Sequence, residues 1–82
     1  MASAAGQHAP PTEQLTSRER EVLNLIAVGY ETKEIAGNLS ISPETVRTHV
    51  RNSMSKLGAR TRAQLVAIAF CPEEALALAR AR

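Results

Sequence analysis

The chain has 82 residues and a formal net charge of +2, and its hydrophobic share of 44% includes one Tyr, one Phe and no Trp. A chain of this length holds one small domain, and a core almost without aromatic residues must be built from Leu, Ile, Val and Ala, which favours packed helices. The single cysteine, Cys71, excludes an internal disulfide and a zinc site of the Cys-x-x-Cys kind.

The first residues predict a disordered leader or an interdomain linker. Residues 1–13 are rich in small residues, contain Pro10 and Pro11, and show neither a hydrophobic period nor a signal peptide. The longest apolar run, residues 63–71, is interrupted by Gln64 and is far shorter than the roughly 20 residues that span a bilayer. We therefore expect a cytoplasmic protein with no membrane segment.

Helix start and stop signals predict two helices over residues 16–39. Residues 16–19, Thr-Ser-Arg-Glu, form a capping box, and the helix that follows places Val22, Leu23, Ile26 and Ala27 at helical spacing before it stops at Gly29. A second, shorter helix is expected from about Thr32 to Leu39, with Ile35, Ala36 and Leu39 on its buried side.

The signals for the third helix are the strongest. Ser42 is an N-cap, Pro43 stands at the first helical position, Glu44 favours the first turn, and Gly58 follows Leu57 as a stop. A fourth helix begins at Thr61 with a second capping box and runs to about Phe70. Two helices joined by about three residues, the second of them longer, are typical of a helix-turn-helix. We therefore predict an all-α, four-helix helix-turn-helix domain over residues 14–70 and a C-terminal tail, 71–82, that is compatible with a short fifth helix.

Charge is concentrated on the third helix and just after it. Residues 12–44 carry three basic and six acidic side chains, whereas residues 45–62 carry five basic side chains and no acidic one. On a helical wheel Val46, Val50 and Leu57 lie on one side with Ser53 beside them, and the opposite side bears hydrogen-bond donors only. A solvated helix usually mixes acids with bases, so this face predicts a polyanionic partner, double-stranded DNA.

The wheel assigns roles along this helix. Arginine donates two hydrogen bonds to guanine in the major groove, and threonine reaches base edges there, so Arg47, Thr48 and Arg51 are the predicted base-reading residues. The side chains predicted to contact the DNA backbone are Thr45, Asn52, Ser55 and Lys56, and His49 is expected to contact phosphate or a neighbouring helix.

Four segments resemble the LuxR-type DNA-binding domain: LTSREREVL at 15–23, KEIA at 33–36, ISPETVRTHV at 41–50 and KLG at 56–58. The resemblance covers about residues 15–69. It implies the C-terminal domain of a quorum-sensing or response regulator, which activates or represses bacterial transcription. It also implies that the second helix braces against the DNA backbone, through Thr32 and Lys33, and that the fourth forms a homodimer contact, through Leu65, Ile68 and Ala69.

Two positions depart from the family pattern. Ser53 stands where a bulky aliphatic residue is usual, so either the core is thin there or Met54 fills the space. Glu31 stands where a Ser or Thr cap usually precedes the second helix, and we expect Thr32 to take over as cap and backbone contact.

Alternatives remain at two points. The fourth helix is apolar nearly all round, with Ala63, Val66 and Phe70 on one side and Leu65 and Ile68 elsewhere, so the C-terminal tail, through Leu76 and Leu78, competes with a second copy for its free face. The alternative function is a protein-interaction module without DNA binding that docks on RNA polymerase or an upstream regulatory domain. An enzyme is disfavoured, because no catalytic, metal or cofactor pattern accompanies His49 or the Glu19 and Glu21 pair.

Overall fold

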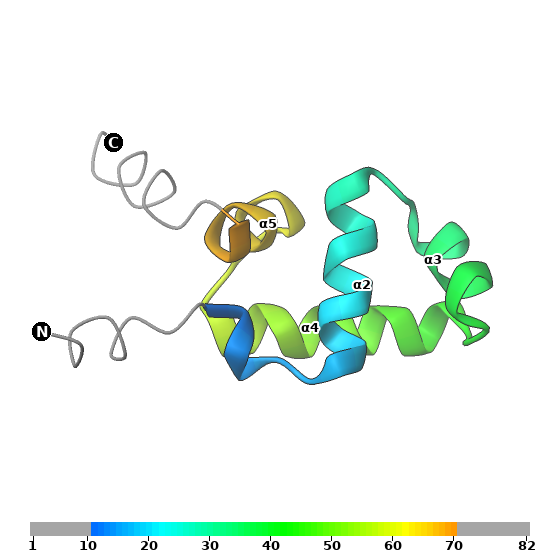
Figure 1. The fold of residues 1–82 in the computed structure, drawn as a ribbon, viewed down its shortest axis with the longest axis horizontal. Helices are drawn as coiled ribbons and strands as arrows, with labels where there is room; N and C mark the ends of the chain where they lie inside the picture. Colours follow the sequence, from blue (N-terminus) through cyan, green and yellow to red (C-terminus); the bar gives the residue numbers. More distant parts are fainter. Residues whose placement is uncertain (1–10, 71–82) are drawn as a thin grey trace, which may run out of the picture.

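The computed structural model describes residues 11–70, whose regular elements are all helices, with no strand among them (Figure 1). The elements are the 3-10 helix η1 (Pro11–Gln14) and the α-helices α2 (Ser17–Val28), α3 (Thr32–Leu39), α4 (Pro43–Leu57) and α5 (Arg62–Phe70). The all-α prediction with four α-helices is confirmed. Residues 11–13, predicted to belong to the leader, instead form most of η1. The predicted fifth helix falls outside the described residues.

Helix α2 begins with the predicted capping box. The Thr16 hydroxyl accepts a hydrogen bond from the Glu19 N–H at 3.1 Å, and the Glu19 carboxylate accepts one from the Thr16 N–H at 2.8 Å. The helix ends at Gly29, whose φ of 112° lies in the left-handed region that glycine adopts without strain. Ala27, expected on the buried side, is exposed.

Helix α3 is capped one residue before its predicted cap. Its N-cap is Glu31, whose backbone N–H donates to the Glu34 carboxylate at 2.7 Å, and Thr32 is the first helical residue. Thr32 therefore does not cap this helix, and that prediction is wrong. The reason is local: with an acid three residues on, Glu31 already has its backbone N–H satisfied.

Helices α4 and α5 follow the predicted signals closely. The Ser42 hydroxyl accepts from the Thr45 N–H at 3.0 Å, and α4 ends at Gly58 with φ 70°. At the start of α5 the Thr61 hydroxyl accepts from the Gln64 N–H at 3.0 Å, whereas the Gln64 side chain accepts from the Arg60 N–H at 2.6 Å and not from Thr61, so only half of the predicted capping box forms. None of the helices in the described part of the chain is long and apolar enough to cross a membrane.

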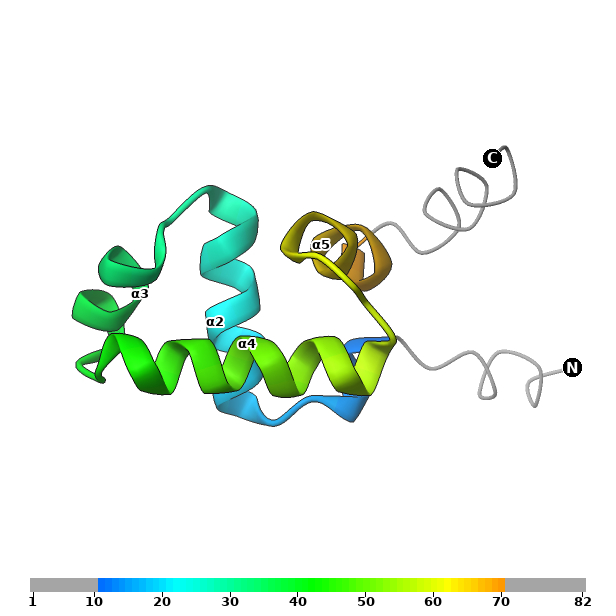
Figure 2. The ribbon, with the colours of Figure 1, turned by 180° about the vertical axis from the view of Figure 1, so that it is seen from behind.

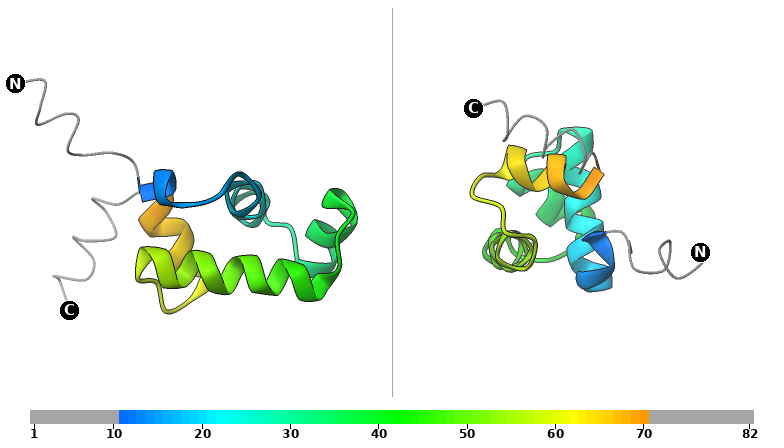
Figure 3. Two further views of the ribbon diagram at one scale, coloured as in Figure 1. Left: turned by 90° about the horizontal axis from the view of Figure 1, so that it is seen from below. Right: turned by 90° about the vertical axis from the view of Figure 1, so that its left-hand side faces the viewer.

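Helix α4 lies along the long axis of the domain, and α2 crosses it (Figures 1 and 2). Seen from below, α3 lies at one end of α4, and α5 with η1 lies at the other (Figure 3). Two hydrophobic clusters fill the spaces between these helices, and Val50 of α4 packs against both. The cluster near α5 consists of Leu15, Leu23, Leu65 and Ala69, and the cluster near α3 consists of Val22, Ile35, Ala36 and Val46.

The buried face of α5 differs from the expectation. Leu65 is fully buried and Ala69 is 9% exposed, both inside the cluster near α5, whereas Ala63 and Phe70 are exposed. Leu65 and Ala69 are therefore not available to a second copy, and their prediction as dimer contacts is wrong. Ile68 is half-buried. A helix that is apolar nearly all round offers two candidate faces, and its neighbours α2, α4 and η1 decide which one is covered.

One ion pair joins the start of α2 to the end of α4. The Lys56 ammonium lies 2.7 Å from the Glu19 carboxylate, whose side chain is only 4% exposed. Burial raises the pKa of Glu19, but the hydrogen bonds from Lys56 and from the Thr16 N–H, together with the charge of Lys56, outweigh it and hold the pKa below its ordinary value. The carboxylate thus serves a helix cap and an interhelical contact at once.

Lys56→Met should lower the free energy of unfolding by about 1–3 kcal/mol, because it leaves a buried carboxylate without its charged partner. Urea denaturation with the midpoint and slope both fitted measures this change. Lys33→Met, which removes an exposed lysine with no ion pair within residues 11–70, is the matched control and should change stability by less than about 0.5 kcal/mol. Equal effects of the two substitutions would contradict a structural role for the pair.

The ion pair should also make stability depend on pH. Because folding lowers the pKa of Glu19 from its ordinary value of 4.5, its contribution is present above the unfolded pKa and is lost as pH falls from there through the lower folded pKa. Melting temperatures measured from neutral pH to about pH 3 should therefore fall less steeply for Glu19→Gln than for the unchanged chain. Glu13→Gln, at an exposed position, should leave the steepness unchanged.

Candidate nucleic-acid interface

Helix α4 presents one buried and one open face, as the wheel predicted. Val46 is fully buried and Ser53 is 1% exposed, whereas Arg51, Asn52 and Ser55 on the other side are exposed. Seen from behind, α4 lies in front of α2 where the two helices cross (Figure 2). The open face is therefore accessible to a large ligand.

The three predicted base-reading residues differ in their partners. The Arg47 guanidinium lies 3.2 Å from the Glu44 carboxylate, and the Thr48 hydroxyl donates to the Glu44 backbone carbonyl at 3.2 Å. The Arg51 side chain forms neither a hydrogen bond nor an ion pair within residues 11–70. The exposed surface of α4, predicted to bear donors only, thus also carries the Glu44 carboxylate, whose spacing of three from Arg47 is that of a helical ion pair.

The residues predicted to contact the DNA backbone are likewise divided. The Lys56 ammonium binds the Glu19 carboxylate inside the protein, so Lys56 connects two helices in this structure. The hydroxyls of Thr45 and Ser42 lie 2.9 Å apart and share a hydrogen bond at the start of α4. Asn52 and Ser55 are exposed, and no hydrogen bond holds their side chains within the described part of the chain.

Ser53 is accommodated by its own helix. Its hydroxyl donates to the His49 backbone carbonyl at 2.8 Å, so the buried oxygen has a partner. Met54 next to it is half-buried and packs against the cluster near α5. The small residue at position 53 therefore leaves no buried polar group without a hydrogen-bond partner. The Met54 side chain contributes to the core beside it, which is one of the two outcomes predicted for this position.

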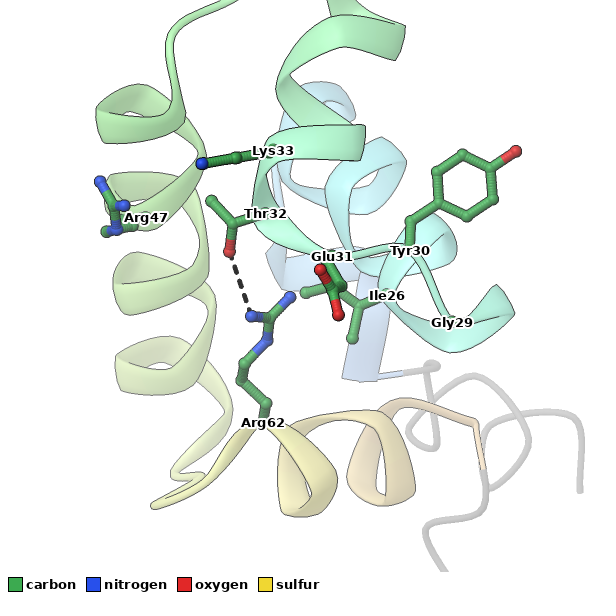
Figure 4. Close-up of a pocket in the computed structure, with 8 residues that line it drawn as sticks. All are labelled: Ile26, Gly29, Tyr30, Glu31, Thr32, Lys33, Arg47 and Arg62. Atoms are coloured by element: carbon green, nitrogen blue, oxygen red, sulfur yellow. Dashed lines mark hydrogen bonds between the residues drawn. The ribbon is translucent and has the colours of Figure 1, made fainter.

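A hollow on the surface is lined by residues of all four α-helices, and its cations come from three of them (Figure 4). Thr32 and Lys33 come from the start of α3, Arg47 from α4 and Arg62 from the first turn of α5. The Arg62 guanidinium donates to the Thr32 hydroxyl at 3.2 Å, which connects helices 30 residues apart in the chain. The remaining residues that line it are Ile26, Gly29, Tyr30 and Glu31. We term this the three-helix hollow.

The three-helix hollow shares Thr32, Arg47 and Arg62 with a second depression along α4. That depression is lined by Arg47 and Arg51 of α4 and again by Arg62, with Thr32, Val50 and Met54 completing it. Arg62 belongs to the basic block of the sequence but has no predicted role there, because only the folded chain brings the start of α5 to the start of α3. Residues 11–70 contain no group of three or more His, Cys, Asp or Glu side chains that could hold a metal ion.

Comparison with known proteins extends these observations. Residues 13–69 match the family described as bacterial regulatory proteins, luxR family. The response regulator protein VraR of Staphylococcus saprophyticus is 47% identical over 70 residues, which cover 85% of this chain and 34% of VraR. The spore germination protein GerE of Bacillus subtilis is 54% identical over 52 residues, which cover 63% of this chain and 70% of GerE.

A solved structure described as that of the transcription factor GerE superposes with a TM-score of 0.63 at 41% identity, covering 80% of this chain and 90% of that one. The chain spans about a third of the length of the VraR protein that it matches. The family match covers more than half of the chain and includes all of α2, α3 and α4, and therefore the open face of α4. The chain therefore belongs to the luxR family of bacterial regulatory proteins, and the matched residues form its DNA-binding helix-turn-helix domain.

Proposed function

We propose that this chain binds DNA sequence-specifically as a homodimer, with α4 in the major groove, and thereby regulates bacterial transcription in the cytoplasm. The observation that carries the proposal is the face of α4 on which Arg47, Arg51 and Asn52 are exposed, opposite the buried Val46. An α-helix fits the major groove, and donors along one side of it can reach base edges.

Arg51 is the strongest candidate for base reading. Its guanidinium has no carboxylate partner within residues 11–70, so it loses no protein contact when it binds guanine. Arg47 must first leave Glu44, but an exposed pair three residues apart contributes only about 0.3–0.5 kcal/mol. Thr48, half-buried beside them, would offer its methyl group to thymine.

The proposed contacts to the DNA backbone come from α4 and from the start of α3. Asn52 and Ser55 are free to bind phosphates along one edge of α4, and Thr32 and Lys33 do so at the start of α3, where a helix N-terminus favours an anion. We retain Thr45 and His49 as contacts at the flanks. We leave Lys56 out of this set, since its ammonium binds Glu19.

We place the dimer contact on the face of α5 that the core does not cover. Ala63 and Phe70 are exposed, Phe70 by 46%, and the intervening Ala67 is half-buried on the same stripe. Ile68, half-buried, flanks it. Two copies joined there would place two α4 helices on half-sites about one helical turn of DNA, roughly 34 Å, or a multiple of it apart.

Further partners follow from the length of the relatives. Because the chain spans about a third of VraR, we propose that an upstream regulatory domain, in a longer protein, controls access to this domain. RNA polymerase is the second partner that we propose, at surfaces that DNA leaves free. The alternative, an interaction module without DNA binding, has one local feature in its favour, the negative charge of Glu31 at the start of α3.

The test of the function is selection from a randomised DNA library, followed by affinity measurements at several salt concentrations. We expect an enriched sequence with two-fold symmetry and an affinity that falls steeply as salt rises. No enriched sequence, or an affinity indifferent to salt, would contradict the proposal and favour the interaction module.

Arg51→Ala should weaken binding to the selected sequence by about 1–3 kcal/mol and relax the preference at one base position, because the alanine removes a bidentate contact to a base. Competition titrations against single-base variants of the site measure this preference. Arg18→Ala removes the same charge from an exposed, Glu21-paired position on α2 and should leave both affinity and preference unchanged. A uniform loss of affinity with Arg51→Ala would show that Arg51 contacts phosphate instead.

Ala63→Glu should abolish cooperative binding to a two-half-site DNA while leaving binding to a single half-site nearly unchanged, since it puts like charges opposite each other at a two-fold contact. Mobility-shift titrations on the two DNAs give both quantities. Ala27→Glu makes the same change at an exposed position of α2 and should preserve cooperativity. Retained cooperativity with Ala63→Glu would rule out this face of α5.

A further inference from the structure

We propose that Arg62, the first residue of α5, binds a DNA backbone phosphate together with Lys33 and Thr32 in the three-helix hollow. This inference rests on the proposed function and adds a DNA contact from a helix outside the helix-turn-helix. It assigns α5 a place in DNA binding as well as in the fold.

The charge of the three-helix hollow is the first argument. Three cations from three helices, Lys33, Arg47 and Arg62, line it, and Glu31 is the one carboxylate among its lining residues. Within residues 11–70 the ion pairs are Arg18–Glu21, Arg47–Glu44 and Lys56–Glu19, so neither Lys33 nor Arg62 has a carboxylate partner there. The cations of the hollow therefore outnumber the one carboxylate that lines it, and the excess positive charge favours an anion.

The hydrogen-bond geometry is the second argument. Arg62 uses one N–H group to donate to the Thr32 hydroxyl at 3.2 Å, which orients the guanidinium and leaves its other donors free. Because the Thr32 oxygen accepts this bond, the hydroxyl proton remains available for another acceptor. A phosphate oxygen beside them can therefore accept from both side chains, and the Lys33 ammonium adds charge at the same place.

The position of the hollow relative to α4 is the third argument. Arg62 lines the depression along α4 together with Arg47 and Arg51, the two arginines that we expect to read bases. A duplex seated on those arginines brings its backbone to the edge of that depression. A free inorganic phosphate has the same chemistry, but the continuity with the base-reading face favours the phosphate of DNA.

The experiment compares Arg62→Gln with the unchanged chain by measuring the affinity for the selected DNA across a series of salt concentrations. We expect the slope of log affinity against log salt to decrease in magnitude by about 0.9, the value for one phosphate contact, and affinity to fall several-fold for selected and unselected sequences alike. Arg62→Lys, which keeps the charge, should retain most of the slope.

Arg60→Gln is the matched control. It removes the same charge two residues earlier, from an exposed side chain that lines neither hollow, and should leave the slope unchanged. Melting temperatures of all variants are measured in parallel. If Arg62→Gln lowers the melting temperature but leaves slope and affinity as they were, Arg62 only connects α5 to α3 and the inference is wrong.

Two further outcomes are distinguishable. If the unchanged chain binds DNA without salt dependence, the proposed function fails, whereas normal binding with an unaltered Arg62→Gln slope overturns this inference alone. Titration of inorganic phosphate, followed by backbone amide shifts at Thr32, Lys33 and Arg62, is the second arm. Saturable phosphate shifts without any change in the DNA slope would mean that the hollow takes a free anion, and would overturn the assignment to DNA.

Discussion

The packing of α4 is the constraint on which the rest of the structure depends. Every other element of residues 11–70, including the short η1, packs against this helix, and both hydrophobic clusters include or contact its buried side. Val46 and Ser53 are almost completely enclosed, while Val50 lies between the two clusters. Because one face is committed to the core along the whole length, the opposite face is both free and rigidly held, which a surface that reads DNA requires.

The Glu19 carboxylate shows how a cap and a long-range contact support each other. It completes the capping box at the start of α2 and binds Lys56 near the end of α4, so the same group fixes a helix end and the crossing of two helices. Burial raises the pKa of this carboxyl group, but both contacts favour its ionised form and together they lower the pKa. Lys56, one of the basic side chains that the sequence predicted to contact DNA, instead forms an ion pair inside the protein.

The three-helix hollow and α5 give the domain a second point of contact beyond the recognition helix. The hydrogen bond from Arg62 to Thr32 connects the start of the helix proposed to dimerise with the start of the helix proposed to brace against the backbone. Glu31 lies in the same hollow and lowers its positive charge. The balance between Glu31 and its three cationic neighbours therefore tunes how strongly this end of the domain attracts an anion.

Local signals in the sequence determined the helices and their ends, because capping boxes, a first-turn proline and terminal glycines act over three or four residues. The alternation of apolar and donor residues likewise determined the two faces of α4. The pairing of Lys56 with Glu19, the approach of Arg62 to Thr32 and the burial of Leu65 in place of Phe70 were decided only by the tertiary structure. These contacts join residues 30 or more positions apart, or choose between two apolar faces of one helix, and no local pattern carries that information.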